Sequence, residues 1–363
     1  MSWTLIPARE FAAHAARWRQ LNDETAASPL LDPDFILPLL AEFGRGDEWL
    51  ASCEQNGRTL AMAILTRRRR GAWESFQPSQ QPVGMWLNLP EAAVPALAHS
   101  LLRSLPGYPL VLGLTQCDPF LTPRPAPGDS ISTVPYIDTS KVTVSGSFDD
   151  YWGARGKNLR ANLKKQRAKL LKEGIATRLD VRRAPQDMAQ AVADYGQLES
   201  AGWKAQGGTA IHPDNAQGRF YRGMLEAFAR RGAASVQRYW FGERLVAVNL
   251  CIEGGGANIV LKTTYDETIS SQYSPALLMR EETTRLLFTE GRYGREEFYG
   301  KVMEWHTRWT DEVRSMYHIN TYRWAALLRL HTLIQQRRAS GAGHSAAAPA
   351  PLVPAHPSEP STE

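Results

Sequence analysis

The stretch ASVQRYWFGERLVAVNLCIEGGGANIVLKTTY, residues 234–265, decides the fold. It contains three runs rich in β-branched and aromatic residues, at 234–241, 245–252 and 258–265, separated by short segments that contain glycine. Because glycine readily adopts the positive φ of tight turns, these segments predict a three-stranded antiparallel meander. The run at 245–252 is almost entirely apolar, which predicts a strand covered on both faces.

The segments on either side of this meander alternate between strand and helix periods. Before it we expect a strand and two helices, and after it a helix, a short strand and a final helix. Gly291 follows the first helix after the meander and is typical of a helix C-terminus. The predicted segments are a strand at 176–184, helices around 188–198 and 220–228, a helix at 274–290, a strand at 297–299 and a helix at 321–336. This order predicts an α/β fold whose mixed, mainly antiparallel sheet is flanked by helices.

The first half of the chain contains a weak copy of part of this pattern. Residues 57–65, GRTLAMAIL, align with residues 242–250, GERLVAVNL, at an offset of 185, with one glycine and two leucines identical. This alignment has two open interpretations: two related α/β halves, or two unrelated hairpins. We favour the related halves. A Pro- and Gly-rich stretch at 122–132 and an Ala/Pro-rich end then suggest a first domain at 1–140, a second at 141–338 and a disordered tail at 339–363.

The composition excludes several protein classes. The chain has 363 residues, of which 43% are hydrophobic and 22% charged, which favours a globular protein of about two domains. No apolar run approaches the ~20 residues of a membrane span, and the N-terminus lacks an apolar secretory core. Cys53, Cys117 and Cys251 are too few and too scattered for a disulfide framework or a cysteine-rich zinc site. We therefore expect a cytoplasmic protein without a bound metal.

The net charge of +5 is concentrated in one segment. Residues 155–172 contain eight lysines and arginines and no acid, so the rest of the chain carries 5 − 8 = −3; a shorter basic run occupies 67–70. Leu159, Leu163 and Leu170 mark one face of a helix whose other sides are basic. A solvated face, a site for an anionic ligand, and contact with nucleic acid or a membrane surface all remain open. Nucleic acid or a membrane surface is the least favoured, because no aromatic residues interleave with the charges and no nucleic-acid-binding motif accompanies them.

Four blocks of sequence together carry a resemblance to a known family. They are NLRANLKKQR at 158–167, AGWK at 201–204, YSPALL at 273–278 and FYGK at 298–301, the last extending to Trp305. In this order, over roughly residues 145–315, they resemble the CelD-like, BioF2-like branch of the GNAT acyltransferases, which is associated with cellulose and other exopolysaccharide biosynthesis. The first half resembles a degenerate GNAT-like domain, as in Fem-type aminoacyl transferases. The resemblance implies tandem GNAT-like halves and acyl-CoA, such as acetyl-CoA, as co-substrate.

In GNAT proteins the loop before a helix binds the CoA diphosphate through main-chain amides. The corresponding residues here are Gln272, Ser274, Pro275, Ala276 and Leu277, and they include no glycine. The first-turn N–H groups of a helix lack intrahelical acceptors and attract anions, so this start can bind a diphosphate. Ser274 as N-cap and Pro275 as first helical residue are equally typical of an ordinary helix start.

Acyl transfer from a thioester needs a base for the nucleophile and an acid for the departing thiolate. Glu304 and His306 flank Trp305 and are the candidate bases, because burial beside an aromatic ring raises the pKa of a carboxyl group and histidine titrates near neutrality. Tyr299 and Tyr273 are the candidate acids. Purely structural roles remain open for all four. The remaining candidates, for binding the acceptor substrate or an anion, are Arg160, Lys164, Arg167, Trp203, Lys204 and Lys301.

Three functions follow, in order of preference. The first is transfer of an acetyl or other acyl group from acyl-CoA to an amine or hydroxyl of a sugar or related envelope or exopolysaccharide intermediate. The second is Fem-type transfer from aminoacyl-tRNA, in which the basic helix would contact RNA. The third is a non-catalytic accessory role in a polysaccharide synthesis complex. The sequence contains neither an H-E-x-x-H zinc motif nor a G-x-x-x-x-G-K-[ST] phosphate loop.

Overall fold

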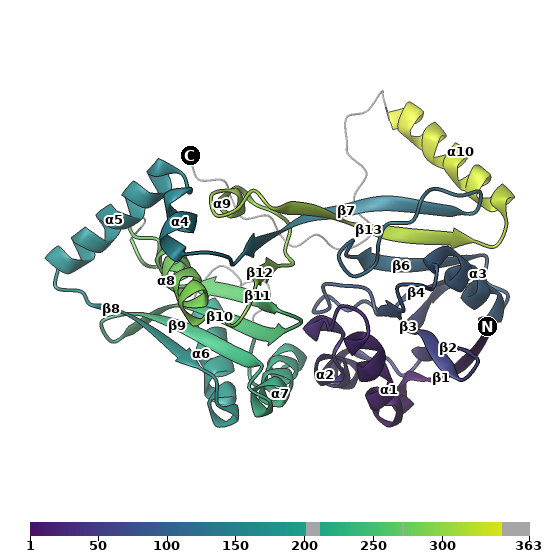
Figure 1. Cartoon of the computed structure of the whole chain (residues 1–363), viewed down its shortest axis with the longest axis horizontal. Helices are drawn as coiled ribbons and strands as arrows, with labels where there is room; N and C mark the ends of the chain where they lie inside the picture. Colours follow the sequence, from purple (N-terminus) through teal and green to yellow (C-terminus); the bar gives the residue numbers. More distant parts are fainter. Residues whose placement is uncertain (201–210, 271, 343–363) are drawn as a thin grey trace.

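The computed structural model describes residues 1–200, 211–270 and 272–342. Figure 1 shows two α/β halves lying side by side, joined along the top by two long strands. The predicted residues Trp203 and Lys204 lie outside the described part, as does the predicted tail beyond residue 342. Residues 339–342, placed in that tail by the sequence, form the end of the last helix.

The first half places helices on both faces of its strands. α1 and α2 pack on the face that presents Met62 and Ile64, and α3 packs on the opposite face, which presents Ala61 and Ala63. This alternation along one strand follows the two-residue period of β-structure. The elements are β1 (Ser2–Pro7), α1 (Phe11–Asp23), α2 (Pro33–Phe43), β2 (Trp49–Gln55), β3 (Arg58–Arg69), β4 (Ala72–Ser75), β5 (Trp86–Asn88), α3 (Val94–Ser104) and β6 (Val111–Cys117), with 3-10 helices at Ala8–Glu10 and Pro29–Leu31.

The second half has the same layered design. α6 and α7 cover the face of the sheet that presents Val248 and Leu250, and α5 and α8 cover the face that presents Tyr239 and Ala247. The elements are α4 (Phe148–Gly153), α5 (Lys157–Lys172), β8 (Thr177–Arg182), α6 (Met188–Ser200), α7 (Ala216–Arg230), β9 (Ala234–Phe241), β10 (Arg244–Gly254), β11 (Ala257–Tyr265), α8 (Pro275–Glu290), β12 (Arg295–Phe298) and α9 (Glu304–Thr307), with a 3-10 helix at Pro185–Asp187.

Two strands, β7 (Ile131–Thr143) and β13 (Val313–Tyr322), make the sheet continuous across the halves. β13 pairs with β6 on one side and with β7 on the other, and the last residues of β7 pair with β12. The order is β1-β2-β3-β4-β6-β13-β7-β12-β11-β10-β9-β8, with β5 beside β3. Only β4 with β6 and β11 with β12 are parallel among the described pairs, so the prediction of a mixed, mainly antiparallel sheet is confirmed. The predicted domain boundary at residue 140 lies within β7.

The two halves also share a hydrophobic core. α2 packs against α7, where the rings of Phe35 and Phe220 meet edge to face at 5.3 Å. The same two helices are joined by an ion pair between Arg219 on α7 and Glu42 on α2, at 2.7 Å. A single cluster of buried side chains therefore runs from α1 and α2 to β10, so each half buries part of its apolar surface against the other.

The internal repeat takes the form of two hairpins with the same irregularity. β2 and β3 turn at Asn56-Gly57, and β9 and β10 turn at Gly242-Glu243. In each returning strand the third residue, Leu60 or Val246, is a bulge without a cross-strand partner. The equivalent positions are therefore 186 residues apart, one more than the alignment of the two glycines indicated, because Gly57 is the second turn residue and Gly242 the first.

The C-terminal end of the fold differs from the sequence prediction. A helix was predicted from Thr321, but Thr321 and Tyr322 end β13, and the helix α10 runs over Ala325–Ala342. The buried residues Tyr317, Ile319 and Thr321 alternate with more exposed ones, which is the strand period. The hydrogen-bond partners of β13 come from β6 and β7, far away in the sequence, so a local pattern alone did not identify it.

Among the described helices, none is long and apolar enough to cross a membrane. Cys53, Cys117 and Cys251 are all free and buried. In the same part of the chain, no three His, Cys, Asp or Glu side chains come together as metal ligands would.

β13 is expected to be a structural part of the first-half core. Ile319 is fully buried there, so Ile319→Ala should lower the free energy of unfolding by about 2–5 kcal/mol, measured by urea denaturation. Val313→Ala is the matched control at the exposed start of the same strand and should cost less than about 1 kcal/mol. Equal losses for the two variants would contradict this assignment.

Candidate active site

The start of α8 is covered by a side chain from α5. The Ser274 N–H donates to Gln166 Oε1 at 3.0 Å, and Gln166 Nε2 donates to Ser274 Oγ at 3.4 Å. The N–H groups of Leu277 and Leu278 donate to the Ser274 carbonyl, both at 3.0 Å, and Pro275 has no N–H. Ala276 N–H is thus the first-turn donor left without an acceptor in the described part of the chain. Gln166 thus pairs with the N–H of Ser274, and the diphosphate site predicted at this start stays a prediction.

The two residues before Ser274 also bind α5. Gln272 accepts a hydrogen bond from Lys169, and the Tyr273 hydroxyl donates to Glu173 at 2.5 Å. Burial and the neighbouring Glu173 carboxylate raise the pKa of Tyr273 to about 12. The hydroxyl predicted as an acid therefore fastens the end of α5 to the start of α8.

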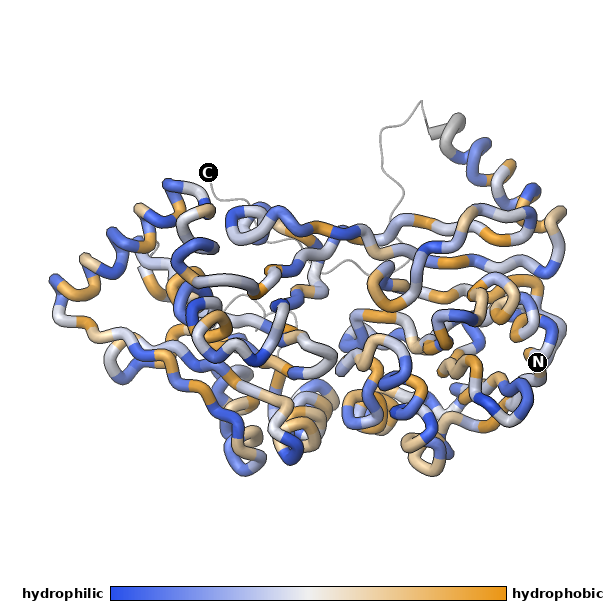
Figure 2. Tube along the Cα trace, in the orientation of Figure 1, coloured by the Kyte–Doolittle hydropathy of each residue, from blue (hydrophilic) through white to orange (hydrophobic). Residues whose placement is uncertain are grey.

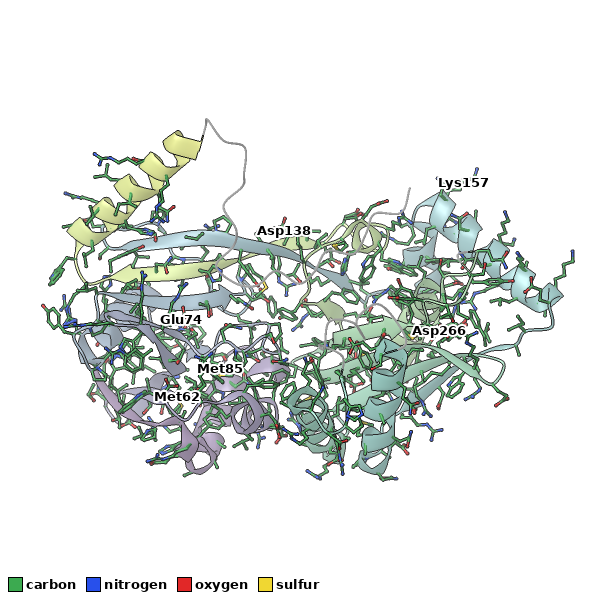
Figure 3. All side chains as sticks on the ribbon, turned by 180° about the vertical axis from the view of Figure 1, so that it is seen from behind. Met62, Glu74, Met85, Asp138, Lys157 and Asp266 are labelled. Atoms are coloured by element: carbon green, nitrogen blue, oxygen red, sulfur yellow. The ribbon has the colours of Figure 1, made fainter. Side chains whose placement is uncertain are left out.

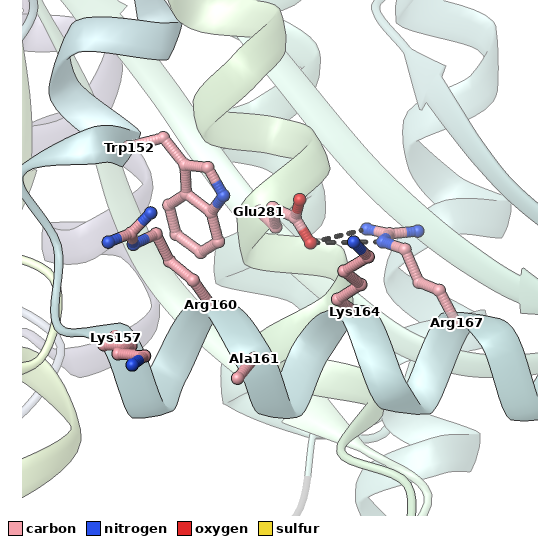
Figure 4. Close-up of a pocket in the computed structure, with 7 residues that line it drawn as sticks. All are labelled: Trp152, Lys157, Arg160, Ala161, Lys164, Arg167 and Glu281. Atoms are coloured by element: carbon pink, nitrogen blue, oxygen red, sulfur yellow. Dashed lines mark hydrogen bonds and ion pairs between the residues drawn. The ribbon is translucent and has the colours of Figure 1, made fainter.

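A pocket of about 470 Å³ lies between α5 and α8 (Figure 4). It includes Glu281, about two helical turns beyond Ser274 along α8. Arg167 closes one end of it, since its guanidinium binds Glu281 at 3.0 Å and Glu282 at 2.7 Å. The other basic side chains of α5 in this pocket face no such acid pair. The pocket is lined by Trp152, Lys157, Arg160, Ala161, Lys164, Arg167 and Glu281. Three residues predicted to bind an anion, Arg160, Lys164 and Arg167, thus come together here.

Aromatic packing gives this pocket a rigid wall. The Trp152 ring stacks on Phe148 with centroids 5.8 Å apart and lies 5.4 Å from the ring of buried Trp309. The Trp309 carbonyl accepts hydrogen bonds from Tyr151 Oη and Arg155 Nη1, both at 2.8 Å. The Arg155 carbonyl in turn accepts from Arg160 Nε at 3.0 Å. A flat indole and a positioned guanidinium therefore face the same space, which suits a ligand with a planar ring and phosphate groups.

Glu304 and His306 differ from the bases expected. Glu304 begins α9, and its side chain is 82% exposed and paired with Arg308 at 2.6 Å, so it lacks the buried environment on which its prediction rested. His306 is buried and stacked on Trp305, and its Nδ1 accepts from the Met303 N–H at 2.9 Å. Burial and the nearby Arg280 charge lower the pKa of His306 to about 4. The ring is neutral at pH 7 and carries its proton on Nε2, so neither nitrogen is free to take another.

Beneath these residues lies a buried ion pair that the sequence analysis missed. Arg280 on α8 sits 3.7 Å from Glu296 on β12, and its guanidinium lies over the rings of Phe298 and Trp305 at 4.3 and 4.8 Å. Asn258 donates to Glu296 at 3.4 Å. Both charged side chains are almost fully buried, and burial raises the pKa of Glu296. The pair therefore fixes α8 against β12 beside α9.

A second buried network joins the halves at the end of β12. Arg314 on β13 binds Asp118 through two nitrogens, at 2.9 and 2.7 Å, and binds Glu297 through the third at 2.8 Å. The Tyr299 hydroxyl donates to the same Asp118 at 2.9 Å, and burial raises the pKa of Tyr299 well above its ordinary value. Tyr299 is thus held by a carboxylate from the first half, which no local pattern in the sequence indicated.

One family model matches part of the chain. Residues 157–307, somewhat less than half of the chain, match the family model described as an acetyltransferase (GNAT) domain. The chain contains a GNAT acetyltransferase domain. This confirms the predicted acyltransferase class and the α/β GNAT-like fold. A search of curated proteins finds no match.

Solved structures resemble nearly the whole chain in fold. The C-terminal domain of a putative lysylphosphatidylglycerol synthetase from Agrobacterium fabrum is 12% identical, with 89% of this chain and 95% of that one covered and a TM-score of 0.55. FemX is 9% identical, with 92% and 100% covered and a TM-score of 0.53. L-PGS from Bacillus licheniformis is 11% identical, with 90% and 96% covered and a TM-score of 0.52. At these identities the likeness concerns the fold alone.

Within and around the GNAT domain, the predicted site residues fall into separate groups. Gln272, Ser274 and Tyr273 contact α5, and His306 stacks on Trp305. Arg160, Lys164 and Arg167 line the pocket. Lys301 is exposed in the segment after β12. Two of the missed residues, Arg280 and Glu297, had a signal in the sequence, since each is a charge inside a predicted helix or strand. Glu296 and Arg314 lie outside the predicted segments and had no such signal.

The low pKa of His306 predicts a pH-dependent stability. Between about pH 6.5 and 4 the unfolded chain binds a proton on this histidine and the folded chain does not, so the free energy of unfolding should fall as the pH drops. This residue should contribute up to about 3 kcal/mol of that loss. Urea denaturation at several pH values tests the expectation: His306→Gln should flatten the profile, whereas the exposed control His212→Gln should not. Identical profiles for wild type and His306→Gln would refute it.

Proposed function

We propose that the protein transfers an acetyl or other acyl group from acyl-CoA to an amine or hydroxyl of a sugar or related envelope or exopolysaccharide intermediate. The proposal includes a place in the CelD-like, BioF2-like branch and a reaction in the cytoplasm. The observation that carries it is the basic, indole-walled pocket between α5 and α8, at the start of the GNAT domain.

The pocket matches the chemistry of a phosphate-bearing acyl carrier. CoA carries an adenine ring, a 3′-phosphate and a diphosphate. Lys157, Arg160 and Lys164 supply positive charge on one face, and Trp152 supplies a flat apolar surface. Because Gln166 occupies the start of α8, cationic side chains of α5 rather than main-chain amides would hold the phosphates. The diphosphate site predicted at residues 272–277 remains a second candidate beside this pocket.

The transfer itself requires two proton movements. The acceptor's amine or hydroxyl attacks the thioester carbonyl and loses a proton, the C–S bond breaks, and the thiolate gains a proton. Glu304 is the better candidate for the first step, because its carboxylate is exposed whereas His306 Nδ1 already accepts a hydrogen bond from the Met303 N–H. We keep Tyr299 and Tyr273 as candidates for the second, although each hydroxyl would first leave a carboxylate. Trp203, Lys204 and Lys301 remain candidates for binding the acceptor.

Fem-type transfer from aminoacyl-tRNA is the second candidate. It is favoured by the fold similarity to FemX and to two lysylphosphatidylglycerol synthetases over about nine-tenths of this chain. The same basic face of α5 would then contact RNA phosphates, and the affinity would fall steeply with salt. Both candidates require the pocket and differ in the carrier that fills it.

Calorimetric titration of the full chain tests the proposal. We expect saturable binding of acetyl-CoA, weakened at least about tenfold by the double variant Arg160→Gln and Lys164→Gln, because each removes a charge-assisted contact to phosphate. The matched control is Lys165→Gln with Lys172→Gln, which removes the same charge from the same helix outside the pocket. It should change the affinity by less than about twofold.

The other outcomes are equally informative. Binding of tRNA without acetyl-CoA would favour the second candidate. Binding of neither carrier would overturn both and leave an accessory role. Equal losses for the pocket and control variants would show that general charge, and not this pocket, attracts the carrier.

A further inference from the structure

One end of the molecule carries basic and apolar surface that the acyl-transfer proposal does not use. α10 leaves the sheet after β13 and rises away from it (Figure 1), and blue and orange residues alternate along it (Figure 2). In its second turn the helix is attached to β13, where His331 Nδ1 and the Tyr322 hydroxyl lie 3.0 Å apart.

The free side of α10 is apolar. Leu330, Leu333 and Ile334 are 55%, 54% and 41% exposed, and their spacing of three and four residues places them on one face of the helix. With 3.6 residues per turn, Arg329 lies on one side of this stripe and Arg338 on the other, and both are exposed. Long arginine stems can cover apolar surface while their guanidinium groups remain in water. The segment 325–342 contains no aspartate or glutamate.

Two loops extend this surface beyond the helix. Trp324 and Tyr108, 49% and 62% exposed, lie with ring centroids 6.0 Å apart at the root of α10, and Arg323 covers the Tyr108 ring at 3.8 Å. The Leu110 N–H donates to the Gly71 carbonyl at 2.8 Å, which brings the turn after β3 to the same end. The basic run at 67–70 covers the end of β3 and the first residue of this turn, and all of it is exposed. Within the run, Arg68 pairs with Glu74 at 3.4 Å.

We propose that this end of the molecule, formed by α10, the Tyr108–Leu110 loop and residues 67–70, docks on an anionic lipid surface. A short apolar stripe flanked by arginines, with exposed aromatic residues at its base, has the chemistry of a helix that lies in the membrane interface. Each arginine near an anionic surface adds attraction, which supplements a stripe of only about two turns. A second copy of this chain fits less well, because it would bring one arginine-rich surface against another.

Sedimentation of the full chain with lipid vesicles tests this proposal. We expect binding to vesicles of two parts phosphatidylcholine to one part phosphatidylglycerol, and little binding to phosphatidylcholine alone. Leu330→Gln with Leu333→Gln should weaken binding about tenfold or more, because the two leucines lose their buried apolar area. Arg329→Gln with Arg338→Gln should weaken it on the order of 25-fold, about fivefold for each charge.

Matched controls separate this end from the other basic helix. Leu171 on α5 is 80% exposed, so Leu171→Gln removes an exposed leucine elsewhere, and Lys165→Gln with Lys172→Gln removes two charges elsewhere. Both should bind anionic vesicles within about twofold of wild type. Circular dichroism and thermal unfolding of every variant should match wild type, since all the altered side chains are exposed.

Several results would overturn the proposal: equal binding to neutral vesicles, unchanged binding of the α10 variants, or an equal loss in the α5 controls. A dimer in light scattering that the Leu330 and Leu333 changes dissociate, without any vesicle binding, would identify a second copy as the occupant instead. Acetyl-CoA titration of the α10 variants separates this inference from the acyl-transfer proposal, because their carrier affinity should equal that of wild type.

Discussion

The structure depends on the buried contact between Arg314 and two carboxylates, Asp118 and Glu297. These groups come from β13, from the residue after β6 and from β12, so one guanidinium ties three strands of both halves together. Asp118 and Glu297 are almost fully buried, and removing one partner of a buried ion pair costs about 3–5 kcal/mol because the other charge is left uncompensated. The planar fork of arginine can satisfy both carboxylates at once, which lysine cannot. The same contact fixes Tyr299 and thereby the segment that leads to α9.

Much of the second half could be predicted from the sequence because its elements are local. The meander at 234–265 has glycine turns and apolar strands that pair with their neighbours along the chain, and Gly291 ends α8 with a φ of +60°. β13 could not be recognised as easily, since its partners β6 and β7 lie far away in the sequence. The pocket was anticipated only as a basic helix; its shape depends on Trp152 and Glu281, which come from other elements.

The covered start of α8 changes how this GNAT domain would hold a phosphate. Main-chain amides at a helix start are fixed in place and work with the helix dipole. Gln166 occupies that position here, and the available positive charge lies on flexible side chains of α5. Attraction by exposed side chains is screened by salt, with a Debye length of about 8 Å at physiological ionic strength. Binding at the α5 pocket should therefore depend on ionic strength more than binding at a helix start would.

The two basic surfaces lie far enough apart to serve the two proposed roles separately. α5 lies at one end of the molecule and α10 at the other, with the shared sheet between them (Figure 1), and the side chains of both helices extend from the body (Figure 3). The aromatic wall of Trp152 and the acids that hold Arg167 turn the α5 surface into a pocket with a defined shape. Among the described residues nothing encloses the α10 surface in this way, and it exposes leucine and isoleucine instead. Enclosure selects a ligand by its shape, whereas an open apolar and basic stripe suits a broad surface, so the proposed docking at α10 would leave the α5 pocket open to a carrier in solution.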